Sequence, residues 1–222
     1  MLRLKELLKE AVYRLAPHRL HLPAYPYMVH PAGMAFLCGW IEKTAEVPGA
    51  VVEIGCAWGN TTLFLSRQMD WLHSDKTYFA IDTFGTGFPP DEVEHEVRVR
   101  GKDRQFLTEA FHFPGMEQKW FQRAMDLAEA RRVQAVTADI SRYDFDPHLR
   151  ISFCFIDVDL YIPVRDALAK VYPLMSPGGV IVLPDCLAGT PYDGALQAYE
   201  EFVRDHGLPV RIEADLFGVI SA

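Results

Sequence analysis

A glycine-rich turn early in the chain is suited to binding a nucleotide-sized ligand. It follows the apolar run of residues 51–54, which favours an extended strand. Gly55 and Gly59 let the backbone turn sharply and approach a ligand closely, because neither residue carries a Cβ. An apolar helical pattern starts next, with Asn60 or Thr61 as its expected N-cap. Strand, turn and helix together predict a binding site for a nucleotide.

The spacing of acids and glycines distinguishes two kinds of nucleotide site. A dinucleotide fingerprint reads G-x-G-x-x-G, whereas the segment from Glu53 to Gly59 reads E-x-G-x-x-x-G, which disfavours a bound pyrophosphate. A second predicted strand, residues 77–81, is followed by Asp82, whose carboxylate could accept hydrogen bonds from both hydroxyls of a ribose. Two acids and two glycines at strand ends suit S-adenosylmethionine.

Three further acids follow apolar strands in the second half of the chain. Asp157 comes directly after residues 151–156, and the carboxyl end of a central strand opens onto the ligand crevice of a doubly wound sheet. It is therefore a candidate catalytic base that could remove a proton from a hydroxyl. Asp159 lies two residues further and could cap the next helix, and Asp185 follows another predicted strand.

Strands and helices alternate from residue 51 onward, which predicts an α/β fold with a Rossmann-like, doubly wound, mainly parallel sheet. The expected strands cover residues 51–54, 77–81, 133–137, 151–156 and 179–183. The expected helices cover residues 33–44, 60–70, 117–131, 162–171 and 193–206. Residues 209–214 and 216–220 read as two closely joined strands, which would form an antiparallel C-terminal edge.

Four segments carry a family resemblance, and they are Val47–Gly55, Ile81–Phe84 with Gly87–Pro89, Ile156–Tyr161 and Tyr172–Val182. In their order and spacing the chain resembles class I S-adenosylmethionine-dependent methyltransferases, and more narrowly the macrocin O-methyltransferase (TylF-like) family. The resemblance covers roughly residues 47–205. It implies an enzyme that methylates a hydroxyl of a sugar, a glycoside or a related product of natural-product biosynthesis.

The resemblance also implies which residues bind the cofactor. It assigns the turn from Glu53 to Gly59 to the methionine part, Asp82 to the ribose, and the strand end at Asp139 and Ile140 to adenine. Glu53 could instead satisfy backbone donors, and Asp139 could instead cap the turn that follows it. The full set of candidate cofactor-binding residues is Glu53, Gly55, Gly59, Asp82, Thr83, Asp139, Ile140 and Asp157.

A metal site is implied with one departure from the family pattern. In the resembling family a carboxylate at the position of Asp157 joins an acidic pair at the end of the next strand to hold a magnesium-type ion. Asp185 matches the second acid of that pair, but Pro184 replaces the first and offers no side-chain oxygen. Either Asp157, Asp159 and Asp185 hold Mg²⁺ weakly with extra waters, or Asp157 acts as a base without metal.

Composition limits the partners and the location. The chain has 222 residues and a formal charge of −8, which argues against a broad nucleic-acid surface and favours a small hydroxylated acceptor. Its four cysteines form no C-x-x-C pair, no run is long enough to span a membrane, and no secretory signal is apparent. We therefore expect a cytoplasmic protein, and we leave a homo-oligomer open.

The expected organisation is an N-terminal helical extension, residues 1–46, followed by a methyltransferase domain, residues 47–222. Residues 2–15 form an amphipathic, basic pattern that could pack on the domain or a partner, or lie on a membrane surface. Residues 83–115 interrupt the alternation and read as a lid or substrate loop. Two other functions remain open: an inactive cofactor-binding scaffold, which Pro184 favours, and a nicotinamide oxidoreductase, which the glycine spacing disfavours.

Overall fold

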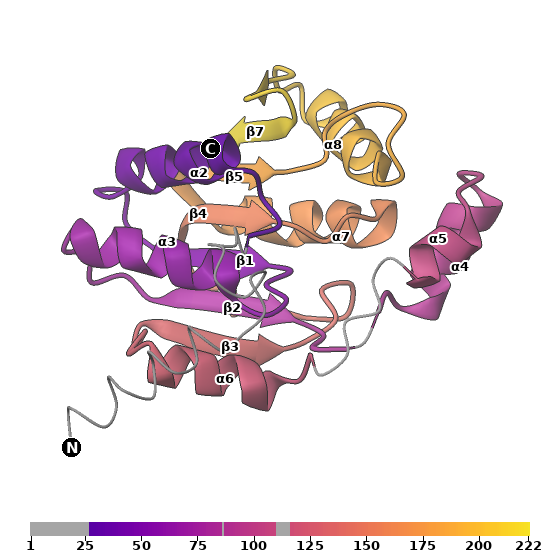
Figure 1. Cartoon of the computed structure of the whole chain (residues 1–222). Coiled ribbons are helices and arrows are strands. Elements are labelled where there is room, and N and C mark those ends of the chain that lie inside the picture. Colours follow the sequence, from indigo (N-terminus) through magenta and orange to yellow (C-terminus); the bar gives the residue numbers. More distant parts are fainter. Residues whose placement is uncertain (1–26, 86, 110–115) are drawn as a thin grey trace, which may run out of the picture.

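The computed structural model describes residues 27–85, 87–109 and 116–222, which form a mixed sheet between two layers of helices (Figure 1). The pattern predicted for residues 2–15 lies outside this range. The strands are β1 (Ala50–Ile54), β2 (Tyr78–Asp82), β3 (Val133–Thr137), β4 (Ile151–Ile156), β5 (Met175–Leu183), β6 (Ile212–Glu213) and β7 (Phe217–Ser221). The helices are α2 (Pro31–Lys43), α3 (Asn60–Trp71), α4 (Pro90–Arg98), α5 (Arg104–Glu109), α6 (Gln118–Leu127), α7 (Tyr161–Val171), the short η2 (Tyr172–Leu174) and α8 (Gly194–Asp205).

The sheet has the order β3-β2-β1-β4-β5-β7-β6. The first five strands pair in parallel, and β7 runs antiparallel to both β5 and β6. All residues of β1 and β4 are buried, because helices cover both faces of a parallel sheet. The predicted Rossmann-like fold with an antiparallel C-terminal edge is confirmed.

Two hydrophobic cores lie on the two faces of the sheet. Side chains of α2, α3 and α6 pack against one face, and side chains of α7 and α8 pack against the other. Met34, Leu37 and Ile41 of α2 belong to the first core, although α2 precedes the boundary predicted at residue 47. The domain division therefore stays a prediction.

The start of α3 differs from the expectation. Its N-cap is Gly59, with a φ of 82°, rather than Asn60 or Thr61. A Cβ on Gly59 would lie 2.7 Å from a ring carbon of Phe121 and 2.8 Å from Met125 Cε. Packing of α6 against the turn, together with the left-handed backbone, therefore requires glycine here.

The segment that interrupts the alternation contains two helices, α4 and α5, whereas residues 110–115 lie outside the described part. Figure 1 shows this pair beyond the arrowheads of the parallel strands, where a crevice is expected. Val93 of α4 and Leu107 of α5 pack with Leu160, which directly precedes α7. The ring of His95 stacks on Tyr161 at 5.2 Å. The insertion is thus packed against the start of α7.

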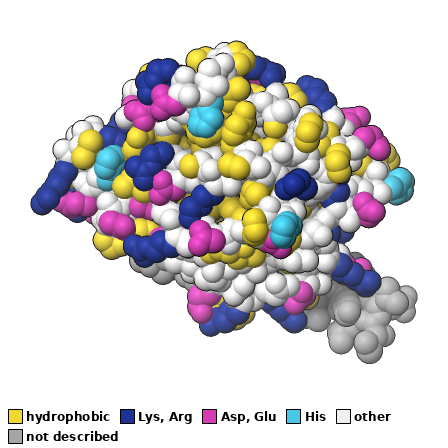
Figure 2. Space-filling model, turned by 180° about the vertical axis from the view of Figure 1, so that it is seen from behind, with side chains coloured by type: hydrophobic (Ala, Val, Ile, Leu, Met, Phe, Trp, Pro, Cys, Tyr) yellow, Lys and Arg dark blue, Asp and Glu magenta, His cyan; other side chains and the backbone are white. Residues whose placement is uncertain are grey.

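The surface carries charges of both signs. In the described part of the face seen from behind, basic and acidic side chains lie interspersed among apolar ones (Figure 2).

Among the described helices, none has the length and hydropathy needed to cross a membrane. Cys38, Cys56, Cys154 and Cys186 are free thiols. The cytoplasmic location and the oligomeric state stay predictions.

Candidate active site

A cavity of about 470 Å³ opens at the carboxyl ends of the parallel strands. This volume lies within the usual range for small-molecule sites. Residues at the ends of β1 and β2 and directly after β3, β4 and β5 form its wall, together with the insertion, the loops before α2, α8 and β7, and the first residue of β7. The lining includes Met28, His30, Ile54, Gly55, Ala57, Asp82, Thr83, Phe88, Glu92, Asp139, Ile140, Asp157, Asp159, Pro184, Asp185, Tyr192 and Phe217.

Gly55 forms part of the cavity wall between β1 and β4. Its φ is 85°, and a Cβ there would lie only 1.9 Å from the carbonyl oxygen of Asp157. The backbone N–H of Asp157 donates to Ile54 O at 2.7 Å, which holds the two strand ends together. No larger residue fits at position 55 without separating the strands. Gly59 lies outside the cavity lining, and its role is in the turn described above.

Glu53 is placed away from the cavity, contrary to the resemblance. Its side chain is fully buried on the α3 side of β1, where its Oε2 accepts hydrogen bonds from Thr62 Oγ1 and, at 2.9 Å, from Tyr78 Oη. Its Oε1 has no hydrogen-bond partner among the described residues. Burial raises the pKa of Glu53 to about 7, although the two hydroxyl donors oppose this shift. The donors are side chains and not the backbone groups considered above.

The pKa of Glu53 predicts how stability depends on pH. The folded state retains a proton that the unfolded chain releases near pH 4.3, so the free energy of unfolding should fall between about pH 4.3 and 7. The loss should reach about 3 kcal/mol above pH 7. Glu53→Gln keeps an oxygen acceptor for Thr62 and Tyr78 and carries no charge. In urea titrations it should therefore match wild type at pH 4 and be more stable at pH 8. An equal difference at both pH values would contradict this assignment.

Asp82 lines the cavity, but most of its carboxylate is used within the protein. Its Oδ2 accepts backbone N–H bonds from Cys56 and Ala57, both at 2.9 Å, and its Oδ1 accepts from Phe84 at 2.7 Å. A carboxylate offers about four acceptor positions, so roughly one remains for a ligand. Asp82 can therefore accept a hydrogen bond from one ribose hydroxyl and not, as was expected, from both. Its bonds to Cys56 and Ala57 also hold the turn after β1. Thr83, beside it, lines the same wall.

Asp139 and Ile140 follow β3 and line the opposite end of the cavity from β5. The Oδ1 of Asp139 accepts a hydrogen bond from the backbone N–H of Ser141 at 2.9 Å, and its Oδ2 lies 3.5 Å from the Arg142 guanidinium. The turn-capping role considered for Asp139 is thus confirmed. Asp139 still lines the cavity while it caps this turn, and with Ile140 it makes this part of the wall partly acidic and partly apolar.

Asp157, Asp159 and Asp185, which we call the acid cluster, come together where β4 and β5 end. One oxygen from each carboxylate lies within 4.8 Å of the others. Burial raises the pKa of Asp157 well above its ordinary value, and Asp159 and Asp185 raise it further. Burial, followed by the charge of Asp185, raises the pKa of Asp159 to about 8. Three carboxylates this close repel one another, so a bound cation would stabilise their charged form.

The backbone also holds the acid cluster in an uncommon conformation. Asp159 and Asp185 have φ values of 61° and 60°, in the left-handed region that non-glycine residues seldom adopt. Asp159 does not cap α7, whose N-cap residue is Leu160, so that alternative is wrong. Instead the N–H of Tyr161 donates to Glu96 Oε1 of α4 at 2.9 Å. The insertion therefore caps α7, and Asp159 is left to face the cavity.

Three polar residues of the cavity were not anticipated from the sequence: His30, Glu92 and Tyr192. His30 Nδ1 also accepts from Gly33 N at 3.2 Å and caps α2. Burial, with the charges of Asp159 and Asp185, raises the pKa of Tyr192 to about 12. No local motif marks His30 or Tyr192. Glu92 belongs to the charged run of residues 91–104, a pattern that predicts an exposed segment.

A sheet in this order, with a glycine turn after β1, an acid ending β2 and an antiparallel β7, defines a class I S-adenosylmethionine-dependent methyltransferase. The chain belongs to the macrocin O-methyltransferase (TylF) family, whose sequence model matches residues 28–220. It is therefore an S-adenosylmethionine-dependent O-methyltransferase. A comparison with curated proteins found no match.

Solved structures support the same fold. The O-methyltransferase NovP is 17% identical with a TM-score of 0.72, and the similarity covers 85% of this chain and 78% of NovP. The calicheamicin methyltransferase CalS11 is 19% identical with a TM-score of 0.71, covering 96% of this chain and 91% of CalS11. At these identities the likeness establishes the architecture.

Proposed function

We propose that this enzyme methylates a hydroxyl of a sugar or glycoside, with a divalent cation held by the acid cluster. The observation that carries this proposal is that the acid cluster lines the same cavity as the turn after β1 and Asp82. One structure of CalS11, with a TM-score of 0.64, is described as a TDP-rhamnose 3′-O-methyltransferase, which supports a sugar acceptor. Family membership argues against the oxidoreductase alternative.

The cofactor should extend along the ends of β1, β2 and β3. Gly55 lines the wall beside which the methionine part would lie, Asp82 has one acceptor position for a ribose hydroxyl, and Ile140 offers an apolar surface to adenine. This placement leaves the acid cluster, at the ends of β4 and β5, for the acceptor. Glu53 has no direct role in it.

The acid cluster fits a hard divalent cation. It offers three carboxylates within the reach of one ion, and such cations prefer oxygen ligands and accept water in the remaining positions. Pro184 also lines the cavity but supplies no side-chain oxygen. A cation bound here would lower the pKa of an acceptor hydroxyl and thus assist its ionisation.

Side chains of the protein would position the acceptor, accept its proton and exclude water. Methyl transfer from a sulfonium is an in-line displacement, so the cavity must hold the acceptor oxygen close to the methyl group. Asp157 lines the cavity between the proposed cofactor and acceptor regions, and we expect it to receive the proton that the hydroxyl loses. Phe88 and Phe217 line the same cavity and would limit access of water to the reacting atoms.

Cofactor binding provides the first test. The protein should bind S-adenosylmethionine and S-adenosylhomocysteine but not NAD in calorimetric titrations. Asp82→Ala should weaken binding by roughly tenfold to a hundredfold, because it removes a charged acceptor and loosens the turn after β1. Asp82→Asn keeps an acceptor for the turn and should lose less. Wild-type affinity in Asp82→Ala would remove this residue from the site.

Turnover provides the second test. Transfer of a labelled methyl group should be screened with nucleotide sugars, glycosides and simple phenols as acceptors. We expect product with a sugar-bearing acceptor and little with phenols. Cofactor binding without turnover on any acceptor would instead favour the inactive scaffold.

A further inference from the structure

Helix α4 buries two acidic side chains on one face. Glu92 is 5% exposed and Glu96 is 1% exposed, and residues four apart lie above one another on a helix. A carboxylate is seldom buried unless it has a partner, because burial without one is costly. Glu96 and Glu92 differ in whether the protein supplies such a partner.

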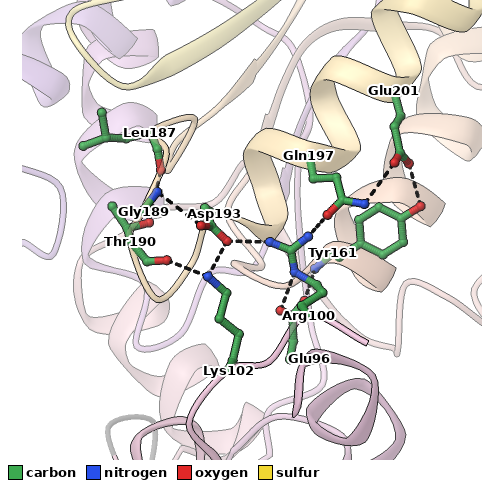
Figure 3. A network of polar contacts seen from close by, with 10 residues as sticks. All are labelled: Glu96, Arg100, Lys102, Tyr161, Leu187, Gly189, Thr190, Asp193, Gln197 and Glu201. Carbon is green, nitrogen blue, oxygen red and sulfur yellow. Dashed lines mark hydrogen bonds and ion pairs between the residues drawn. The ribbon is translucent and has the colours of Figure 1, made fainter. Parts of the chain in front are cut away.

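Glu96 is satisfied within the protein, as Figure 3 shows. Its Oε1 accepts from the backbone N–H of Tyr161 at 2.9 Å, and its Oε2 accepts from Arg100 Nε at 2.7 Å. Arg100 also pairs with Asp193, which is held in turn by Lys102. This network ties α4 to the start of α7 and to the loop before α8, so it fixes the position of Glu92 one turn earlier.

Glu92 has no such partner. No hydrogen bond or ion pair joins its carboxyl to any of the described residues, and its side chain lines the cavity. A buried polar group that faces a cavity without a protein partner marks a place where a ligand supplies the missing hydrogen bonds.

The charged groups around Glu92 locate it within the cavity. They are Asp91 of α4, Asp139 and Arg142 after β3, and Asp166 of α7. Of these charges, that of Asp139 has the largest effect on the pKa of Glu92. Since β3 and β5 lie on opposite sides of β1, Glu92 is at the β3 end of the cavity, away from the reaction. Under the proposed function this end receives adenine.

We propose that Glu92 recognises the adenine ring of the cofactor as a neutral carboxylic acid, accepting from the exocyclic amine and donating to the adjacent ring nitrogen. The edge of adenine presents an N–H donor beside a ring-nitrogen acceptor. A protonated carboxyl presents the complementary pair, whereas a carboxylate accepts only. Burial, then Asp139 and Asp91, raise the pKa of Glu92 to about 8, while Arg142 opposes them, so the neutral form prevails at pH 7.

The inference rests on the proposed cofactor site, and the experiment separates the two. Calorimetry would measure wild type and variants against S-adenosylhomocysteine and against its analogue in which a hydrogen atom replaces the exocyclic amine. Absence of S-adenosylhomocysteine binding by wild type would overturn the cofactor site itself. If wild type binds, we expect it to prefer the adenosyl ligand by about tenfold or more.

Three substitutions then test Glu92. Glu92→Leu should lose about tenfold to a hundredfold in affinity and most of the preference for the amine, the scale expected for two neutral hydrogen bonds. Glu92→Gln presents an acceptor and a donor like the neutral acid, so it should bind as wild type at pH 7. Wild-type affinity should then fall above pH 8 relative to Glu92→Gln, and this comparison cancels any titration of the ligand. Glu94→Leu, at a partly exposed position of α4 outside the cavity lining, is the matched control and should not change binding.

Two results would overturn the proposal. Unchanged ligand preference in Glu92→Leu, with a melting temperature near wild type, would show that Glu92 does not contact the base. Equal losses in Glu92→Gln and Glu92→Leu would show that the site uses a charged carboxylate rather than a neutral acid. If Glu92→Leu does not fold, the pH comparison between wild type and Glu92→Gln still decides.

Discussion

Asp157→Asn is expected to lower kcat by about 100-fold or more, the usual scale for losing acid–base assistance. The substitution preserves the size of the side chain and removes its negative charge, so it weakens Asp157 both as a base and as a cation ligand. Affinity for S-adenosylhomocysteine should change little. The melting temperature should stay the same or rise slightly, because one of three mutually repelling carboxylates is gone.

Single-turnover kinetics, calorimetry and thermal unfolding of the same preparation would check this prediction. Asp144→Asn is a suitable control, because that side chain is 97% exposed and remote from the acid cluster. Asp159→Asn should be impaired less if Asp159 acts only as a ligand. Near-normal turnover by Asp157→Asn together with an inactive Asp159→Asn would show that the two roles are reversed.

Removal of divalent cations should abolish most of the activity. The three carboxylates have raised pKa values when no cation is bound, so removal of the cation favours their protonated forms and weakens Asp157 as a base. We expect at least a 100-fold loss after treatment with EDTA and full recovery with Mg²⁺ or Mn²⁺. The concentration required should be high, because Pro184 supplies no ligand.

Pro184→Asp offers a matched test of the same site. The added carboxylate should lower the half-saturating metal concentration by about tenfold, a change equivalent to 1.4 kcal/mol. Asp185→Asn should raise that concentration. Full wild-type activity after exhaustive chelation would support Asp157 as a base without metal.

Much of the architecture follows from local patterns in the sequence. Apolar runs with turns after them predicted the five parallel strands to within a few residues at their ends. The rule that such strands open onto a common crevice predicted the position of Asp157, and the family resemblance placed Asp185 beside it, 28 positions further along the chain. These predictions succeed because strand propensity and turn chemistry depend on neighbouring residues.

The role of Glu53 is determined by tertiary packing. The side chains of β1 alternate between the two faces of the sheet, and Glu53 points to the face covered by α3. Its hydroxyl partners come from α3 and β2, and no local signal identifies them. The family resemblance placed Glu53 in the cofactor turn, whereas packing placed it in the core.

The sequence by itself determined the order of strands and helices, the glycine turn and the set of acids available for chemistry. Only the tertiary structure decided which of those acids are buried, paired or directed into the cavity. Residues 91–104 read as one charged run, yet Glu96 and Arg100 are buried there because α7 and the loop before α8 supply their partners. Glu92 lies on the same helix face with no such partner among the described residues. Burial of a charge depends on groups distant in the chain, so local residue patterns cannot reveal it.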